Sequence, residues 1–255
     1  MNSKNIDLKK IYNRVFVDDD SNFFTCNLYE ESTMIIDMCD DWKGKTVLEI
    51  GCGTGNLASM IRYTGVKHIL AVDYSSEAIK RATEKYNLSR VKYRNCNYKD
   101  VKGKYDIIVM QGVLEHLDNP FQELDYIRNN LLSRNGIIIT SSPSFLNPRG
   151  YVWMTLATLF NVPMSLTDLH FLCPFDFKTY CEKNNLNLEY KSGYQDWGSG
   201  ETTIRDFKKR LVNALSDANM DNSKVPLLLE WMEKAIPYSK QTNDTGAIIC
   251  YKISK

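Results

Sequence analysis

Residues 47–56 read VLEIGCGTGN, and this stretch decides how the rest of the chain is interpreted. An apolar run typical of a buried strand leads into Gly51, Gly53 and Gly55, which stand at alternate positions. Glycine has no Cβ, so a backbone built from it can turn tightly and come close to a ligand. A helical pattern over residues 57–63 follows. The stretch therefore predicts a strand–loop–helix crossover, the place where α/β sheets bind ligands.

The spacing of the glycines distinguishes a dinucleotide-binding loop from another kind of cofactor loop. A dinucleotide fingerprint, G-x-G-x-x-G, would need glycine at position 56, and the chain has Asn56 there, which disfavours an NAD-dependent oxidoreductase. From Glu49 to Gly55 the loop resembles the E/D-x-G-x-G-x-G loop of class I S-adenosylmethionine (SAM)-dependent methyltransferases. The resemblance covers residues 45–142 well and 174–193 loosely. It implies SAM as the cofactor and S-adenosylhomocysteine (SAH) as its product.

Strand-like and helix-like patterns alternate after residue 45, which predicts a parallel sheet covered by helices on both faces. Asn119, Pro120 and Gln122 carry the signals of a helix start, and Gly136 predicts that helix's end. The resemblance implies an α/β fold, a doubly wound seven-stranded sheet that is mostly parallel with the last strand antiparallel, with helical lid insertions after strands 5 and 6. The predicted strands are 46–50, 68–73, 91–95, 105–110, 137–141, 188–193 and 246–252, and the predicted helices are 56–63, 76–86, 120–132 and 174–184.

No repeat, low-complexity stretch or shift in composition divides the 255 residues, so residues 1–255 are predicted to form a single methyltransferase domain. Residues 1–44 are expected to form an N-terminal helical cap, and residues 45–142 the SAM-binding core. Residues 143–173 and 200–245 fall outside the recognisable pattern and are expected to be insertions on the acceptor side.

Composition excludes several other classes of protein. The 32 basic and 31 acidic residues leave a net charge of +1, which gives no overall electrostatic case for a nucleic-acid partner. The seven cysteines are scattered without C-x-x-C spacing, so neither a disulfide framework nor a zinc site is indicated, and no metal is expected. The first ten residues are polar and lack the apolar core of a signal peptide, which predicts a cytoplasmic protein.

One segment, residues 150–167, contains no charged residue. It is too short, and too interrupted by Asn161 and Pro163, to be expected to span a membrane. A buried helix, a lid over the acceptor, or a subunit contact in a homodimer are the alternatives for it.

Acidic residues end the first two predicted strands. Glu49 lies just before the glycines, where the resemblance implies a carboxylate that helps to hold the methionine end of SAM. Asp73 closes the strand 68–73, about 20 positions after the loop, as the acidic residue of dinucleotide sites does. A carboxylate there can accept hydrogen bonds from both hydroxyls of a ribose.

The resemblance extends the cofactor site to two more strands. Asn97 stands where the family often has an acidic residue for the adenine amino group, and an amide oxygen can accept that hydrogen bond too. Gln111 lies in the segment 105–116, which resembles the family's fourth strand, and would face the sulfonium. The segment has no Asn/Asp-Pro-Pro-Tyr turn of DNA and protein-glutamine N-methyltransferases, which disfavours methylation of base amino groups. The expected cofactor-binding residues are Glu49, Gly51, Cys52, Gly53, Gly55, Asn56, Asp73, Tyr74, Cys96, Asn97 and Gln111.

Methyl transfer from SAM is an in-line displacement, so orientation of the acceptor supplies much of the rate. An oxygen acceptor gains a further factor of about 10²–10⁴ from a general base. Among the three histidines, His170 is preferred as this base because it follows the uncharged segment, and Asp168 could orient it. His116, in a position similar to the family's L-x-H, is the alternative catalytic residue. His68 opens a strand and is expected to be a surface residue.

These observations predict a SAM-dependent methyltransferase acting on a small-molecule acceptor, at a hydroxyl oxygen, in bacterial glycan or secondary-metabolite biosynthesis. The alternative is a SAM-binding regulatory or scaffold protein without catalysis, which would need no acceptor base. The acceptor itself is not identified, because the acceptor-side segments resemble nothing specific.

Overall fold

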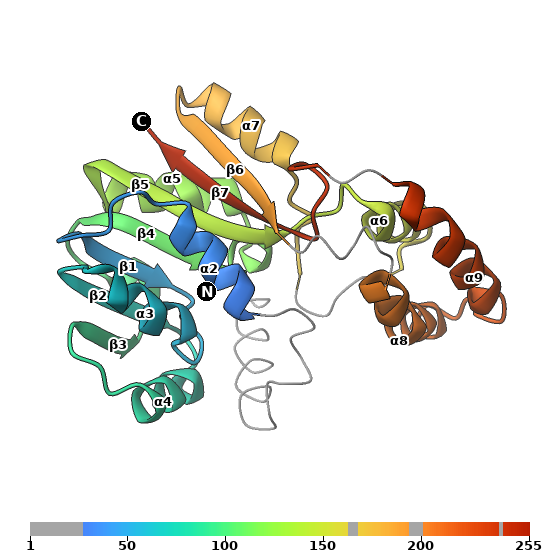
Figure 1. Cartoon of the computed structure of the whole chain (residues 1–255), viewed down its shortest axis with the longest axis horizontal. Coiled ribbons are helices and arrows are strands. Elements are labelled where there is room, and N and C mark those ends of the chain that lie inside the picture. Colours follow the sequence, from blue (N-terminus) through green and yellow to red (C-terminus); the bar gives the residue numbers. More distant parts are fainter. Residues whose placement is uncertain (1–27, 163–167, 194–200, 240–241) are drawn as a thin grey trace.

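A seven-stranded sheet forms the centre of the computed structural model, which describes residues 28–162, 168–193, 201–239 and 242–255 (Figure 1). The strand order is β3-β2-β1-β4-β5-β7-β6; β1 to β5 are mutually parallel, and β7 is antiparallel to both of its neighbours. This confirms the predicted doubly wound sheet with an antiparallel last strand. The strands are β1 (Thr46–Ile50), β2 (His68–Asp73), β3 (Val91–Asn95), β4 (Tyr105–Gln111), β5 (Leu132–Pro143), β6 (Asn187–Gly193) and β7 (Ile248–Ser254).

Helices cover both faces of the sheet, because side chains along each buried strand point alternately to opposite faces. Val47 packs with Ile35 and Leu57 on one face, whereas Leu48 packs with Leu124 and Phe177 on the other. The helices around the sheet are α2 (Leu28–Asp37), α3 (Asn56–Ile61), α4 (Ser76–Lys85), α5 (Pro120–Asn130) and α7 (Pro174–Lys183), with 3-10 turns at Arg62–Thr64, Tyr98–Asp100, Leu114–His116 and Ile236–Tyr238.

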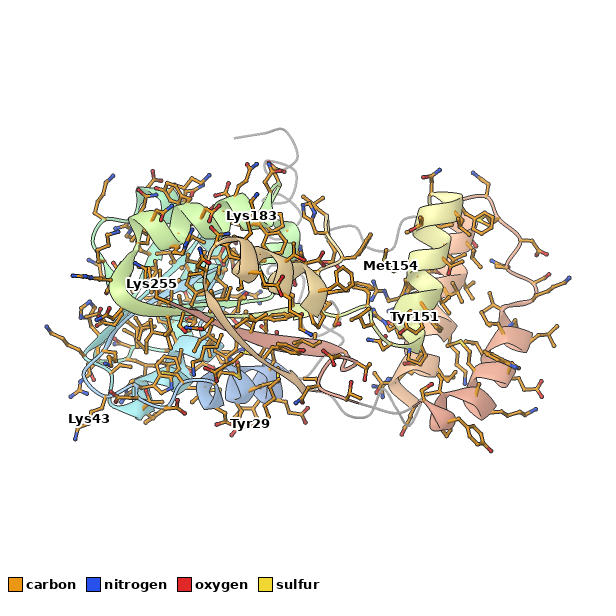
Figure 2. All side chains as sticks on the ribbon, turned by 90° about the horizontal axis from the view of Figure 1, so that it is seen from above. Tyr29, Lys43, Tyr151, Met154, Lys183 and Lys255 are labelled. Carbon is orange, nitrogen blue, oxygen red and sulfur yellow. The ribbon has the colours of Figure 1, made fainter. Side chains whose placement is uncertain are left out.

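Three further helices form a separate layer with its own core. They are α6 (Pro148–Phe160), α8 (Glu201–Asp217) and α9 (Val225–Ala235), and they lie beyond one end of the sheet in both views (Figures 1 and 2). Trp153 packs edge-on against Phe207 at 5.6 Å between ring centroids, and both are fully buried. Since α6 follows the carboxyl end of β5 and α8 follows β6, the predicted helical insertions after these two strands are confirmed in position.

The strand order reverses between β1 and β4, because the chain from β1 moves outward to β2 and β3 before returning to β4. In open α/β sheets, the crevice at such a switch point lies outside the carboxyl ends of the strands and binds ligands. The glycine loop leaves β1 at this end of the sheet, which fixes where a site has to be sought.

Two predictions about helix α5, its end and its N-terminal cap, are wrong. The helix ends at Asn130, and Gly136 lies inside β5 instead of ending the helix. A Cβ on Gly136 would lie 2.9 Å from the carbonyl oxygen of Asp106, so the glycine permits a close approach to β4 beside a register shift. The Asn119 side chain makes no capping hydrogen bond, although Pro120 opens the helix as predicted.

Candidate cofactor and acceptor site

The glycine loop turns at the tip of β1 and is held against β2. The backbone N–H groups of Gly51 and Cys52 donate to the Val72 carbonyl at 2.8 and 3.1 Å. Gly55 has φ +84°, a left-handed conformation, and a Cβ added there would lie 2.7 Å from the Tyr93 hydroxyl oxygen. Only glycine can adopt this left-handed conformation and also leave room for the Tyr93 ring.

Asp73 at the tip of β2 clamps this loop. Its Oδ2 accepts from the Gly53 N–H at 2.9 Å and its Oδ1 from the Ser75 N–H at 2.8 Å. Burial raises the pKa of Asp73, while these N–H donors act in the opposite direction. An ionised carboxylate has about four acceptor positions, so the side chain keeps capacity for further donors such as hydroxyls.

Glu49, the last-but-one residue of β1, is a buried acid without a full set of partners. The residue is 2% exposed, and its Oε2 accepts no hydrogen bond from the described part of the chain. Burial, and then the neighbouring charge of Asp73, raise the pKa of Glu49 to about 8. A buried polar atom left unsatisfied costs roughly 1–3 kcal/mol, so Glu49 is suited to a ligand that brings a donor or a positive charge.

Two of the expected cofactor residues, Cys52 and Tyr74, lie beside these carboxylates, and a third, Asn56, has other partners. Cys52 is buried, and burial raises the pKa of its thiol well above the usual range. Tyr74 follows Asp73 and is partly buried, which raises the pKa of its phenol. The Asn56 amide oxygen instead accepts from the Tyr86 hydroxyl at 2.7 Å and the Lys85 ammonium at 3.3 Å. Asn56 thus ties the start of α3 to the end of α4.

The tip of β3 brings Cys96 and Asn97 next to Asp73. The Cys96 N–H donates to the Asp73 carbonyl at 3.1 Å. The Asn97 side-chain oxygen accepts from the Lys99 N–H at 2.9 Å and so caps a 3-10 turn. One lone pair of that oxygen is therefore already engaged, and a second remains for a ligand amino group.

Helix α2, which belongs to the segment expected to form an N-terminal cap, contacts β4 and β5, but its residues Glu31 and Ser32 were not among the expected site residues. The Ser32 hydroxyl donates to the Gln111 side-chain oxygen at 2.9 Å. Glu31 is 4% exposed beside Gln111 and Ser141, and burial raises its pKa. One feature of the sequence indicates that Glu31 is buried. It lies four residues before the apolar Ile35, so the two side chains share one face of the helix.

The two candidate catalytic histidines have different partners. The His116 Nδ1 lies 3.4 Å from the Asp168 Oδ1, and both side chains are mostly buried. The His170 Nε2 lies 3.1 Å from the Asp118 carbonyl oxygen. Asp168, expected as a partner of His170, thus pairs with His116. Residues 168–170 form neither helix nor strand, so their spacing in the sequence did not fix which of their side chains would meet.

Glu115 anchors this segment and was also missed. Its carbonyl oxygen accepts from the N–H groups of Leu169 at 2.8 Å and His170 at 3.2 Å. Its carboxylate accepts from the Ser142 hydroxyl at 3.1 Å. Burial, and then the charge of Asp168, raise the pKa of Glu115 well above its usual range. The turn after β4 and residues 168–170 therefore form one unit at the edge of the crevice.

The tips of β1, β2, β3 and β4 bring the expected cofactor residues together, whereas His68 lies exposed at the opposite end of β2. Within the described ranges, no group of three or more His, Cys, Asp or Glu side chains is arranged to hold a metal ion. No helix in that part of the chain is long and apolar enough to cross a membrane. Residues 1–27 of the expected cap lie outside the described residues.

Two methyltransferases from other organisms are similar to part of this chain. The ribosomal protein L11 methyltransferase of Lactobacillus johnsonii is 35% identical over 108 residues, which are 41% of this chain and 33% of that protein. The mitochondrial ubiquinone biosynthesis O-methyltransferase of Saccharomyces cerevisiae is 32% identical over 103 residues, 38% of this chain and 33% of that protein. The matched region thus spans about a third of the length of each relative.

Solved structures share the fold at low identity. The DhpI–SAM–HEP complex superposes with a TM-score of 0.62 at 12% identity, covering 100% of both chains. A methyltransferase in complex with the Haloferax volcanii Trm112 activator has a TM-score of 0.62 at 12% identity, covering 95% of this chain and 96% of that one. Residues 37–191, more than half of the chain, match the methyltransferase domain family. The chain therefore belongs to the class I SAM-dependent methyltransferases.

Proposed function

We propose that this protein transfers a methyl group from SAM to a hydroxyl oxygen of a small molecule. The observation that carries the proposal is the pair of buried carboxylates, Glu49 and Asp73, on either side of the glycine loop. SAM has a ribose diol for Asp73 and a cationic methionine amino group for the unsatisfied oxygen of Glu49. Gln111 would face the sulfonium, and Asn97 the adenine amino group.

The acceptor oxygen would attack the methyl carbon in line with the bond to sulfur. That bond breaks, its electron pair stays on sulfur, and neutral SAH forms, so the acceptor proton needs a recipient. We assign this role to His116, because Asp168 can orient its imidazole and stabilise the imidazolium, as in other carboxylate–histidine pairs. His170, the preferred residue from sequence, has its ring directed to a backbone carbonyl.

Two competing functions make different demands on the same residues. A SAM-binding protein without catalysis would not need the His116–Asp168 pair. A nicotinamide enzyme would need a glycine where Asn56 binds Tyr86. By name, one relative is a methyltransferase of ribosomal protein L11 and another is an O-methyltransferase of ubiquinone biosynthesis. A protein acceptor therefore belongs in the same activity screen as hydroxylated metabolites, including those of bacterial glycan and secondary-metabolite synthesis.

Helix α6, which has no charged residue after Arg149, suits the acceptor side of the crevice. Tyr151, Leu159 and Phe160 are 59%, 66% and 53% exposed, so part of its surface remains available to an apolar acceptor or to a second copy of the chain. The oligomeric state at several protein concentrations distinguishes these two uses. The six cysteines in the described residues are free thiols, which suits a reducing, cytoplasmic setting.

Calorimetry is expected to detect binding of both SAM and SAH to the wild-type protein. Asp73→Ala is expected to weaken SAM binding by about 1–3 kcal/mol, because hydrogen bonds to a charged acceptor are lost and the clamp on Gly53 is released. Asp217→Ala removes an exposed carboxylate on α8 and is the matched control. Tight binding of NAD with no binding of SAM would contradict the assignment.

SAM affinity is expected to rise with pH between about 6 and 8 and then to level off, because a cationic ligand favours ionised Glu49, whose pKa is about 8 in the free protein. Glu49→Gln should flatten this rise, whereas Glu84→Gln, an exposed change, should not. The same shift makes the ligand-free fold lose stability as pH increases from 4.5 to about 8, since the folded state then holds the extra proton. An unchanged pH profile in Glu49→Gln would show that another group controls it.

A further inference from the structure

A second groove lies at the edge of the sheet, away from the cofactor loop. It has a volume of about 450 Å³ and is lined by His68, Leu70, Arg90, Lys92, Arg94 and Tyr105. β3 is the terminal strand of the sheet here (Figure 1). His68 and Asp73 stand at opposite ends of β2, about 16 Å apart at the rise of a strand, so the groove is separate from the carboxylates of the cofactor site.

The groove combines a cationic rim with an apolar floor. Lys92 and Arg94 are two residues apart on β3, so their side chains project from the same face of the sheet. Lys92 is opposite Leu70 in the register of β2 and β3, which places the basic group beside an apolar one. The ring of Tyr105, from the start of β4, completes the floor.

Among the described residues, no carboxylate forms an ion pair with the arginines and lysine of this rim. Within the described ranges, no Asp or Glu oxygen lies within 4.0 Å of His68, Arg90, Lys92 or Arg94, whereas Arg81 and Lys234 each pair with a glutamate one turn away. The Arg90 guanidinium instead donates to a backbone carbonyl at 3.4 Å, and that of Arg94 donates to the Cys96 sulfur at 3.0 Å and to the Asp100 carbonyl at 3.2 Å. The whole chain carries only +1, so this concentration of charge is local.

Protection of a sheet edge does not explain the arrangement. Lysine on an edge strand discourages pairing with other chains, and this would account for Lys92. It does not account for His68, which is on the interior strand β2, or for Arg90, which precedes β3. Arg90 has φ +72°, and the other three described non-glycine residues with positive φ are asparagines, which tolerate this conformation better.

We propose that this groove binds a nucleotide-like organic phosphate, with the phosphate on the basic rim and the flat base on the apolar floor. Arginine binds phosphate through two parallel N–H donors, and lysine adds a point charge. The volume lies within the range of about 300–1,000 Å³ for small-ligand sites. A free nucleotide and a nucleotide within single-stranded RNA share this chemistry. The inference does not depend on the proposed methyl transfer.

The test uses uridine ligands, in the presence of saturating SAH, so that adenosine recognition at the cofactor site does not interfere. Binding of uridine monophosphate, a six-uridine RNA and uncharged uridine is measured by calorimetry. Arg90→Asn with Lys92→Gln removes two charges, and asparagine suits the positive φ of position 90. This double variant is expected to weaken phosphate binding at least about tenfold, with SAH binding unchanged.

Lys183→Gln with Lys224→Gln removes the same charge from exposed sites on other elements and should leave binding as in the wild type. Binding of both phosphate ligands identifies a free-nucleotide site, and binding of the RNA alone identifies a strand. The proposal is overturned if neither ligand binds, if uridine binds as tightly as its monophosphate, or if the two double variants weaken binding equally.

Discussion

Replacing His116 by alanine is expected to lower the rate of methyl transfer by about two to four orders of magnitude while SAM affinity changes little. The imidazole would take the proton from the acceptor hydroxyl, so it would contact the acceptor and not the cofactor. Asp168→Asn should lower the rate less than His116→Ala, because it weakens orientation of the ring without removing the base. SAH release is measured with an acceptor found by screening.

His170→Ala is the matched control, since it removes the same side chain from the neighbouring segment. Its ring faces the Asp118 carbonyl, so most of the activity should remain. The opposite result, activity lost in His170→Ala and kept in His116→Ala, would transfer the base role to His170. If both variants stay fully active, transfer proceeds by orientation of the reactants alone. An acceptor that is already ionised should show a smaller loss, because it has no proton to give up.

Gly53→Val is expected to abolish SAM binding while the protein stays folded. Gly53 has φ +49°, and its N–H donates to Asp73 within the loop that would hold the cofactor. A branched side chain would occupy space at the ligand and disfavour the turn. Calorimetry measures binding, and circular dichroism with thermal unfolding measures the fold.

Gly44→Val separates the effect of backbone strain from the loss of the site. Gly44 also has a positive φ, +71°, and a Cβ there would meet nothing within 4 Å. Both variants should lose stability by about 1–2 kcal/mol, the cost of a left-handed residue with a side chain. Only Gly53→Val should lose SAM binding. A folded Gly53→Val that binds SAM normally would make Gly53 a turn former alone.

The parallel core of the sheet was predictable because its signals are local. Strands β1, β2 and β3 have the predicted bounds, since each is a short run that ends at a loop-forming residue or directly before one. The glycine loop, with Glu49 before it and Asp73 on the next strand, follows from the chemistry of a strand–helix crossover. Hydrophobic periodicity and glycine positions act over a few residues, so one sequence is enough to read them.

The sequence alone determined the fold class and the positions of the glycine loop, Glu49 and Asp73 at the ends of the first two strands. The tertiary structure decided the rest, including the pairing of Asp168 with His116, the approach of Glu31 to Gln111, and the separate core formed by α6, α8 and α9. The basic groove at β2 and β3 also became visible only there, because a net charge of +1 says nothing about where charges gather. These contacts join residues far apart in the chain, and spacing along a sequence carries no information about which distant side chains meet.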